Sequence, residues 1–556
     1  MSNARYRQFT LAHVLHHLER DESLTANRSR DLISAVNRTC ELLGRPASDL
    51  PAAAPDLRTR LAKLHPAQAG IRAKTLSNLK SNLTAALVAA GAMLPTLPKA
   101  EPTAGWQRFV ACVSRKQKHQ IYVLSRFITY CCHQSLEPAQ VNAATMAAFK
   151  DYLQRRLITK DPEEYAKEVA QTWNGIIRRN GLKLTEIDRE QDNRYRCRPL
   201  SDYPESLGRD LQGYLDRLAH VDPLAEHGPD KPLRMLSLRN VEAHVRQYLD
   251  ALVGSGIPIR ELTDLNKAVT AEHMKRAFTA IMGRRGLKEP PCGLHNIAGT
   301  LLAIARHLLE LPEGEIEAIK KLKRRVTNFK IGMSEKNKAR LTQFNDWENI
   351  ARLVTLPAVL MERAEANPDA RASALDAMHA AETAILLACP MRVKNLAGLD
   401  LDRHLITQRH GTHTRYTIHI EGREVKNGVP IEVQLSANTS KLLHKYITRF
   451  RGQLSSHTGT ALFPRRSDGR PRSPGQLGQH LGQLIYQETG LRMNTHLFRH
   501  FAAKLYLKEK PGDYETVRRL LKHKKLDTTV SFYAEFSSQW AHDHYDETVL
   551  SKWGGK

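Results

Sequence analysis

Six side chains in the last third of the 556-residue chain have the types needed to bind and attack a phosphodiester. They are two arginines, a lysine, two histidines and a tyrosine: Arg392, Lys426, His496, Arg499, His523 and Tyr533. A guanidinium presents a planar fork of donors to two phosphate oxygens, a geometry that an ammonium group lacks. A tyrosine hydroxyl, with a reference pKa of about 10, can act as a nucleophile when a base or nearby cations assist it. The set predicts phosphoryl transfer through a tyrosine ester without a metal ion.

The order of these residues resembles that of the tyrosine recombinases, the phage integrase family. The motifs that carry the resemblance are MRV at 391–393, VKNG at 425–428, HLFRH at 496–500, KH at 522–523 and FYA at 532–534. With motifs, the resemblance covers roughly residues 340–540. It extends more loosely to residues 102–195 or 232–315. The family implies no cofactor and no metal.

The resemblance implies that Arg392 and Arg499 clamp the scissile phosphate from two sides and stabilise the charge that builds on it. Lys426, in the turn REVKNGVP, matches the family's general acid for the leaving 5′ hydroxyl. Arg423, in the same turn, is a rival for that role. A lysine at a turn tip can also serve solubility alone.

The two histidines match family positions that assist proton transfer or bind phosphate. His496 opens a helix expected behind the cap residues of Asn494-Thr495, where the first turn directs donors toward an anion. His523 is expected to donate to a phosphate oxygen, and His500 to be a packing or supporting residue. The family commonly has glycine before the second histidine, whereas this chain has Lys522, so the local turn is the point of departure.

The expected nucleophile is Tyr533, ten residues after His523 in DTTVSFYAEF. Tyr545 is the alternative, in a tail that could pack on a neighbouring protomer. The HxxR spacing alone is not specific, because it also occurs at His17–Arg20 and His273–Arg276. The order of the whole set favours Arg499 over these.

Composition favours a nucleic-acid partner. The net charge is +26 and the pI about 9.8, an excess typical of proteins that bind a polyanion. The seven cysteines include no CxxC pair, which argues against structural zinc and fits a reducing cytoplasm. No stretch reaches the roughly 18 apolar residues of a membrane span. An RNA-binding helical array is an alternative, but it would need stacking aromatics or a code in each repeat.

The length suits about three or four domains. The expected parts are helical units at 1–98, 99–200 and 230–318, a basic linker at 319–340 and a catalytic domain at 341–556. The three units share a loose pattern of helix, loop and closing helix, which resembles the core-binding domain of tyrosine recombinases. Weak periodicity makes residues 196–232 a further connector. The basic run within the linker is expected either to be solvated or to lie against phosphates.

The expected fold class is mainly α, with a small β-hairpin or sheet in the catalytic domain. Apolar residues alternate over 416–420 and 429–433 around a polar turn, which is typical of a β-hairpin. Helical periodicity dominates elsewhere, with helices expected at the stretches that begin RASALDAM, SANTSKLL, SPGQLGQH, THLFRHFA and YETVRRLL.

These observations favour a site-specific DNA recombinase or integrase, of a mobile element, that works through a 3′-phosphotyrosyl intermediate. The expected partners are double-stranded DNA, three further protomers in a tetramer on two sites, and accessory recombination proteins. The alternatives are a type IB topoisomerase, a telomere resolvase, or a catalytically silent DNA-binding accessory protein. The cytoplasm, at the nucleoid, is the expected location.

Overall fold

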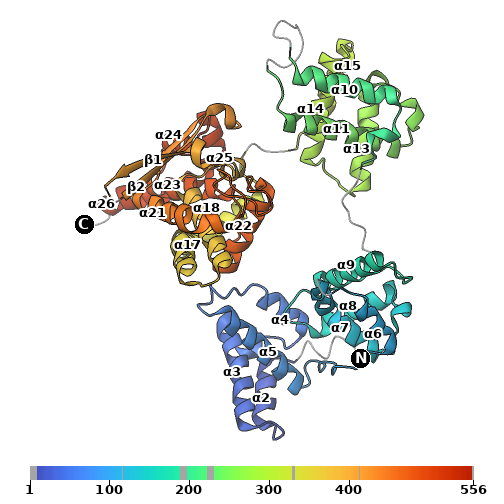
Figure 1. Cartoon of the computed structure of the whole chain (residues 1–556), viewed down its shortest axis with the longest axis vertical. Coiled ribbons are helices and arrows are strands. Elements are labelled where there is room, and N and C mark those ends of the chain that lie inside the picture. The colour runs from blue at the N-terminus through green and yellow to red at the C-terminus, as the bar shows by residue number, and fades with distance from the viewer. Residues whose placement is uncertain are drawn as a thin grey trace. The chain divides into compact units, whose positions relative to one another are not determined.

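The computed structural model describes residues 9–114, 117–187, 197–221, 231–328, 332–411 and 413–553. The chain divides into two compact units, one made of residues 191–331 and the other of residues 1–190 with 332–556. Both are helical except for one small sheet (Figure 1). The fold class expected from the sequence is confirmed. Among the described residues, no helix combines the length and the apolar character required to cross a membrane.

The described part of the first 190 residues contains two large hydrophobic clusters and a small one of Ala35, Leu76 and Leu79. Four helices surround the first: α2 (Leu11–Arg20), α3 (Ala26–Leu43), α4 (Ala54–Leu61) and α5 (Ala73–Ala89). Four more surround the second: α6 (Ala104–Ala111), α7 (His119–His133), α8 (Ala143–Arg156) and α9 (Pro162–Asn180). Aromatic rings fill the second cluster, where Trp106 and Trp173 lie 5.9 Å apart between ring centroids.

Residues 191–331 form a separate bundle. Its helices are α10 (Glu205–Ala219), α11 (Met235–Gly254), α12 (Leu265–Ala268), α13 (Ala271–Arg284), α14 (Cys292–His307) and α15 (Glu313–Arg325). The connector expected at 196–232 is wrong over α10, because Leu207 and Leu211 are buried in the bundle core. Their spacing of four residues, continued by Tyr214 and Leu218, is the helical signal that the sequence contained.

The linker expected at 319–340 also differs from the structure. Residues up to Arg325 belong to α15, whose Ile319 is fully buried while its lysines and arginines face outward. Helix α16 (Glu335–Leu341) follows within the C-terminal part, and Leu341 is buried there. The basic run is therefore largely the polar face of an amphipathic helix.

The remaining helices belong to the part that carries the candidate site. They are α17 (Trp347–Ala366), α18 (Ala370–Ala388), α19 (Val393–Ala397), α20 (Leu401–His404), α21 (Ala437–Lys445), α22 (Pro474–Thr489), α23 (Leu497–Glu509), α24 (Tyr514–Leu520), α25 (Leu526–Tyr545) and α26 (Ser551–Trp553). Helices α17 and α18 pack against each other, and α18 is buried along most of its length. One large hydrophobic cluster joins these helices to the sheet.

The sheet has three antiparallel strands in the order β1 (Leu405–His410), β2 (His413–Ile420) and β3 (Ile431–Gln434). The expected hairpin is confirmed as β2 and β3, with Ile418 opposite Val433. Alternation places Ile418 and Ile420 in the core. Strand β1 adds a third member that the sequence reading did not include.

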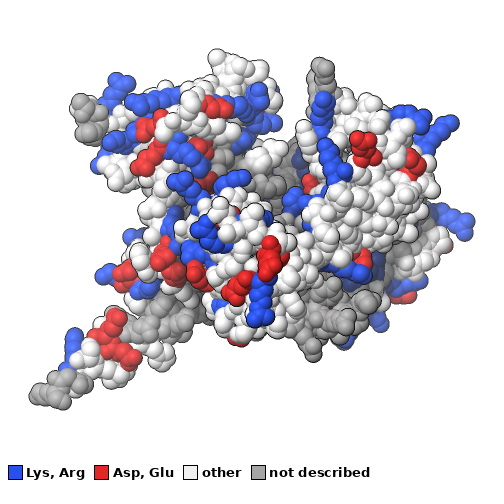
Figure 2. All heavy atoms as spheres, turned by 90° about the horizontal axis from the view of Figure 1, so that it is seen from below, with Lys and Arg blue, Asp and Glu red and all other residues white. Residues whose placement is uncertain are grey.

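Positive charge is not confined to one patch on the face in Figure 2. Lys and Arg side chains are spread across that face, with Asp and Glu side chains among them. On this face, the basic side chains are therefore dispersed and do not gather at one place.

Candidate active site

Arg499 lies in the first turn of α23 and is 4% exposed. Its Nη1 donates to the carbonyl oxygen of Pro390 at 2.7 Å, and its Nη2 to that of Leu521 at 2.5 Å. The Asn494 side chain accepts from the backbone N–H of Leu497 at 2.8 Å, although the N-cap residue itself is His496, which makes no side-chain cap hydrogen bond. These contacts fix the plane of the guanidinium between two chain segments distant in sequence.

Arg392 stands at the start of α19, directly after the break at Pro390. Its side chain is half-buried, and Nη1 donates to Oδ1 of Asn427 at 3.4 Å. Burial lowers the pKa of Arg392. Unlike Arg499, it has a side chain as its partner and not the main chain.

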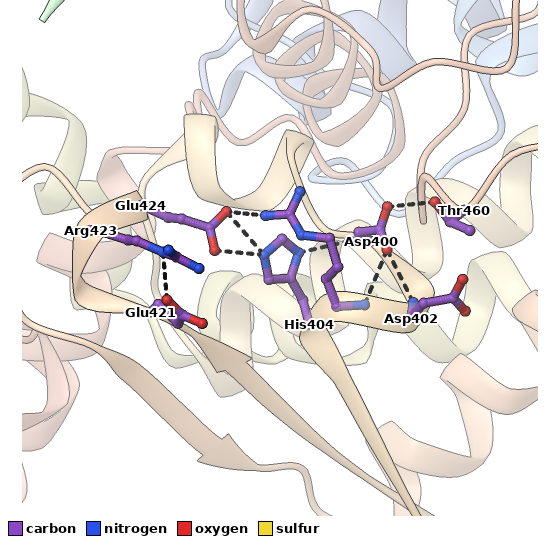
Figure 3. A network of polar contacts seen from close by, with 8 residues as sticks. Asp400, Asp402, His404, Glu421, Arg423, Glu424 and Thr460 are labelled. Carbon is purple, nitrogen blue, oxygen red and sulfur yellow. Dashed lines mark hydrogen bonds and ion pairs between the residues drawn. The ribbon is translucent and has the colours of Figure 1, made fainter.

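Lys426 lies in the loop between β2 and β3 and is exposed. The residue before it, Val425, is 1% exposed and belongs to the core. The rival Arg423 pairs with Glu421 at 2.6 Å, and its side chain is 80% exposed (Figure 3). Among the described hydrogen bonds and ion pairs, none involves Lys426 Nζ. The geometry therefore leaves Lys426, and not Arg423, as the loop cation with an uncommitted charge.

The turn before His523 has the conformation that glycine favours. Lys522 has φ of 52°, in the left-handed region. The Asn427 side chain donates to the Lys522 carbonyl oxygen at 2.5 Å, and His523 Nδ1 lies 2.9 Å from the buried Thr529 hydroxyl. The sequence departure from glycine therefore leaves the expected turn in place, held by a side chain from the loop.

Tyr533 is in α25 and is 1% exposed. Its hydroxyl lies 2.9 Å from Nδ1 of His500. Tyr545, the alternative nucleophile, is 50% exposed at the end of the same helix. Twelve residues of helix place it about 18 Å further along the axis. Only Tyr533 lies beside the other candidate residues.

The electrostatics of this cluster are dominated by cations. Burial, and then the charge of Arg392, lower the pKa of Arg499 to about 10. Burial and the neighbouring cations lower the pKa of His523 to about 4 and that of His500 to about 3. Packing around its ring and the two arginines also lower the pKa of His496. Burial raises the pKa of Tyr533, although Arg499 partly offsets this. Such a cluster favours an anion.

The structure brings together most of the expected site. Five residues lie close enough to affect one another's charge: Arg392, His496, Arg499, His523 and Tyr533. Lys426 joins them through its neighbour Asn427. The other HxxR pairs lie in α2 and α13, outside this cluster. Within the described ranges, no three His, Cys, Asp or Glu side chains are grouped to hold a metal ion.

Sequence reasoning missed two contacts. His500 was expected to pack or support, but it contacts the Tyr533 hydroxyl directly. Its position four residues after His496 places both rings on one helix face, with centroids 4.9 Å apart. Asn427 was not singled out, although it contacts both Arg392 and the turn before His523. The spacing of four residues between His496 and His500 could have indicated the role of His500. The contacts of Asn427 depend on tertiary structure and leave no sign in the sequence.

Comparison with known proteins identifies this part of the chain. Residues 359–539 match the phage integrase family. No curated protein matches the chain. Weak structural likenesses include a XerH site-specific recombinase bound to difH substrate, with 16% identity over 56% of this chain and 79% of that one and a TM-score of 0.36. A Tn1549 transposon integrase in complex with transposon right end DNA has 13% identity over 61% of this chain and 98% of that one, with a TM-score of 0.35. Residues 359–539 therefore form a domain of the phage integrase family, the family of the tyrosine recombinases.

Proposed function

We propose that the protein is a site-specific DNA recombinase that cuts and rejoins DNA through a 3′-phosphotyrosyl intermediate. One observation carries the proposal: a buried tyrosine, hydrogen-bonded to a neutral histidine, lies among two arginines and a second histidine within an integrase family domain. The pKa values of His500 and His523, about 3 and 4, keep both rings neutral near pH 7. Neutral His500 can accept a hydrogen bond from the Tyr533 hydroxyl, and neutral His523 can donate one to a phosphate oxygen.

Cleavage would proceed by direct displacement at phosphorus. A bond forms between Tyr533 Oη and the phosphorus atom while the bond from phosphorus to the 5′ oxygen breaks. The phenolic proton passes to a histidine nitrogen, and Lys426 Nζ supplies a proton to the leaving 5′ oxygen. Arg392 and Arg499 stabilise the added negative charge of the transition state. A 5′ hydroxyl from the partner strand then reverses these steps and joins the new strand.

The burial of Tyr533 implies a movement before attack. A hydroxyl on a side chain that is 1% exposed must become accessible to reach a phosphodiester in duplex DNA. On this proposal Tyr533 is a nucleophile held in storage, and DNA binding would have to shift the segment of α25 around it. The ordered contact with His500 sets the position from which this movement begins.

The wider assignment follows from the family and the charge. The partner would be double-stranded DNA, bound by the catalytic part and by the helical units before it, and four protomers would act on two sites. Accessory recombination proteins are further proposed partners. A mobile element is the proposed carrier, and the nucleoid in the cytoplasm the proposed location.

The decisive experiment is covalent capture of DNA. Nicked duplexes taken from the DNA that flanks the gene would trap the tyrosine ester, because the short 5′ product diffuses away. Wild-type protein should give an adduct on denaturing gels, and Tyr533→Phe should give none while binding DNA within a few-fold of wild type. Tyr545→Phe is the matched control and should form the adduct normally. An adduct with Tyr533→Phe would overturn the assignment of the nucleophile.

A further inference from the structure

The loop between β2 and β3 is anchored on both sides of Lys426. On the side before it, Glu424 contacts His404 at 3.3 Å and also pairs with Arg403 (Figure 3). The His404 ring is itself fixed, because Nδ1 accepts from the backbone N–H of Asp400 at 3.0 Å. Val425 then enters the core. The backbone up to residue 425 is therefore held by both ionic and apolar contacts.

On the side after Lys426, one side chain makes the connection to the site. Asn427 uses both ends of its amide: Oδ1 accepts from Arg392, and Nδ2 donates to the carbonyl oxygen of Lys522. Gly428 follows with φ of 75° and donates its N–H to the Val425 carbonyl oxygen at 3.2 Å. This turn leaves Lys426 exposed between two fixed neighbours.

We propose that Asn427 is a positioning residue that couples the loop of Lys426 to Arg392 and to the turn of His523. The inference rests on the proposed function, in which Lys426 protonates the leaving group. Its physical basis is that a flexible lysine transfers a proton well only when its backbone is fixed relative to the scissile phosphate. The amide of Asn427 fixes the loop relative to the site, because it connects Arg392, which is 35 positions away in the chain, with Lys522, which is 95 positions away.

Leaving-group chemistry separates this role from a general structural role. A 5′ oxygen leaves as an alkoxide unless it is protonated, whereas a thiol has a reference pKa of about 8.5 and leaves without an acid. DNA with sulfur in place of the bridging 5′ oxygen therefore does not need Lys426. A variant that has lost only the placement of Lys426 should regain its rate on the sulfur substrate.

The experiment compares cleavage of oxygen and sulfur substrates by four variants. Lys426→Ala sets the reference for loss of the acid. Asn427→Ala should cleave the oxygen substrate at least about 10-fold more slowly than wild type, and the sulfur substrate within about 3-fold of it. Asn427→Asp keeps the acceptor for Arg392 but loses the donor to Lys522, and should fall in between. Asn438→Ala, in α21, is the control and should match wild type on both substrates.

Two results would overturn the proposal: equal impairment of Asn427→Ala on both substrates, or no impairment on either. Amide hydrogen exchange gives a readout that needs no activity. Asn427→Ala should speed exchange at Gly428 and also at His523, whose N–H donates to the Arg518 carbonyl oxygen at 2.9 Å. Unchanged exchange at His523 would refute the coupling, even if the wild-type protein formed no adduct and the proposed function itself failed.

Discussion

The side chains that α23 and α25 bring to the site are held differently from those of the loop between β2 and β3. Arg499, His500 and Tyr533 are each at most 4% exposed and contact one another or the main chain within the core. Lys426 is exposed, and the loop depends on Glu424 and Asn427 for its place. The buried group can keep its geometry without substrate, whereas the loop group relies on a few polar contacts. We infer that the buried residues are already arranged to stabilise the charge of the transition state. The position of Lys426, the proposed general acid, can instead change with the loop.

The two arginines test this difference most strongly. Arg392→Lys and Arg499→Lys should each slow cleavage by about 10²-fold or more, because charge remains but the fork geometry is lost. Only Arg499→Lys should also destabilise the fold, by about 1–3 kcal/mol, since the carbonyl oxygens of Pro390 and Leu521 lose their donors. Adduct formation rates and urea unfolding measure the two effects. Equal stability of both variants would show that Arg499 is no more structural than Arg392.

Lowering the pH should destabilise the buried residues Arg499, His500 and Tyr533 before it affects the loop between β2 and β3. The pKa of His500 is about 3 in the folded protein, below its ordinary value of about 6.5, so between these values the unfolded chain binds a proton that the folded chain does not. The free energy of unfolding should therefore fall as pH drops below about 6.5, with His500 contributing on the order of 3 kcal/mol by pH 4. Urea unfolding midpoints across this range measure the trend, and His500→Gln should flatten it. An unchanged slope in that variant would place the titration elsewhere.

The two histidines at the start of α23, His496 just before the helix and His500 within it, allow storage of the nucleophile to be tested separately from proton transfer. His500→Gln keeps an acceptor near the Tyr533 hydroxyl but removes the ring that can take its proton, and cleavage should slow about 10-fold. His496→Gln leaves the described contact with Tyr533 intact. The two variants are compared by measuring the rate of single-turnover cleavage as a function of pH. A larger loss with His496→Gln than with His500→Gln would move the proton acceptor to His496.

The sequence was most informative where residue type and order decide the outcome. The order of the motifs predicted that Arg392, Arg499 and Tyr533 would lie together, as they do, while their chemical roles stay predictions. The hairpin could be predicted because its alternation has a period of two. Helix α10 was missed although Leu207 and Leu211 keep a helical spacing, because nearby Pro and Gly suggested a connector. Asn427 could not be found, since its partners lie far along the chain and only the fold brings them within reach.

The smallest expected effect concerns Lys522, which stands where the two groups meet. A non-glycine residue in the left-handed region costs about 1 kcal/mol, and glycine removes this cost while adding entropy to the unfolded chain. Lys522→Gly should therefore stabilise the protein slightly, by at most about 1 kcal/mol, provided that the contact from Asn427 to its carbonyl oxygen holds the turn. Lys524→Gly, two residues on and at ordinary φ, should instead be neutral or destabilising. Thermal unfolding of the two variants beside wild type gives the comparison. If Lys522→Gly lowered the melting temperature, the lysine side chain itself would be holding the turn, and the loop group would be less dependent on Asn427 than its contacts indicate.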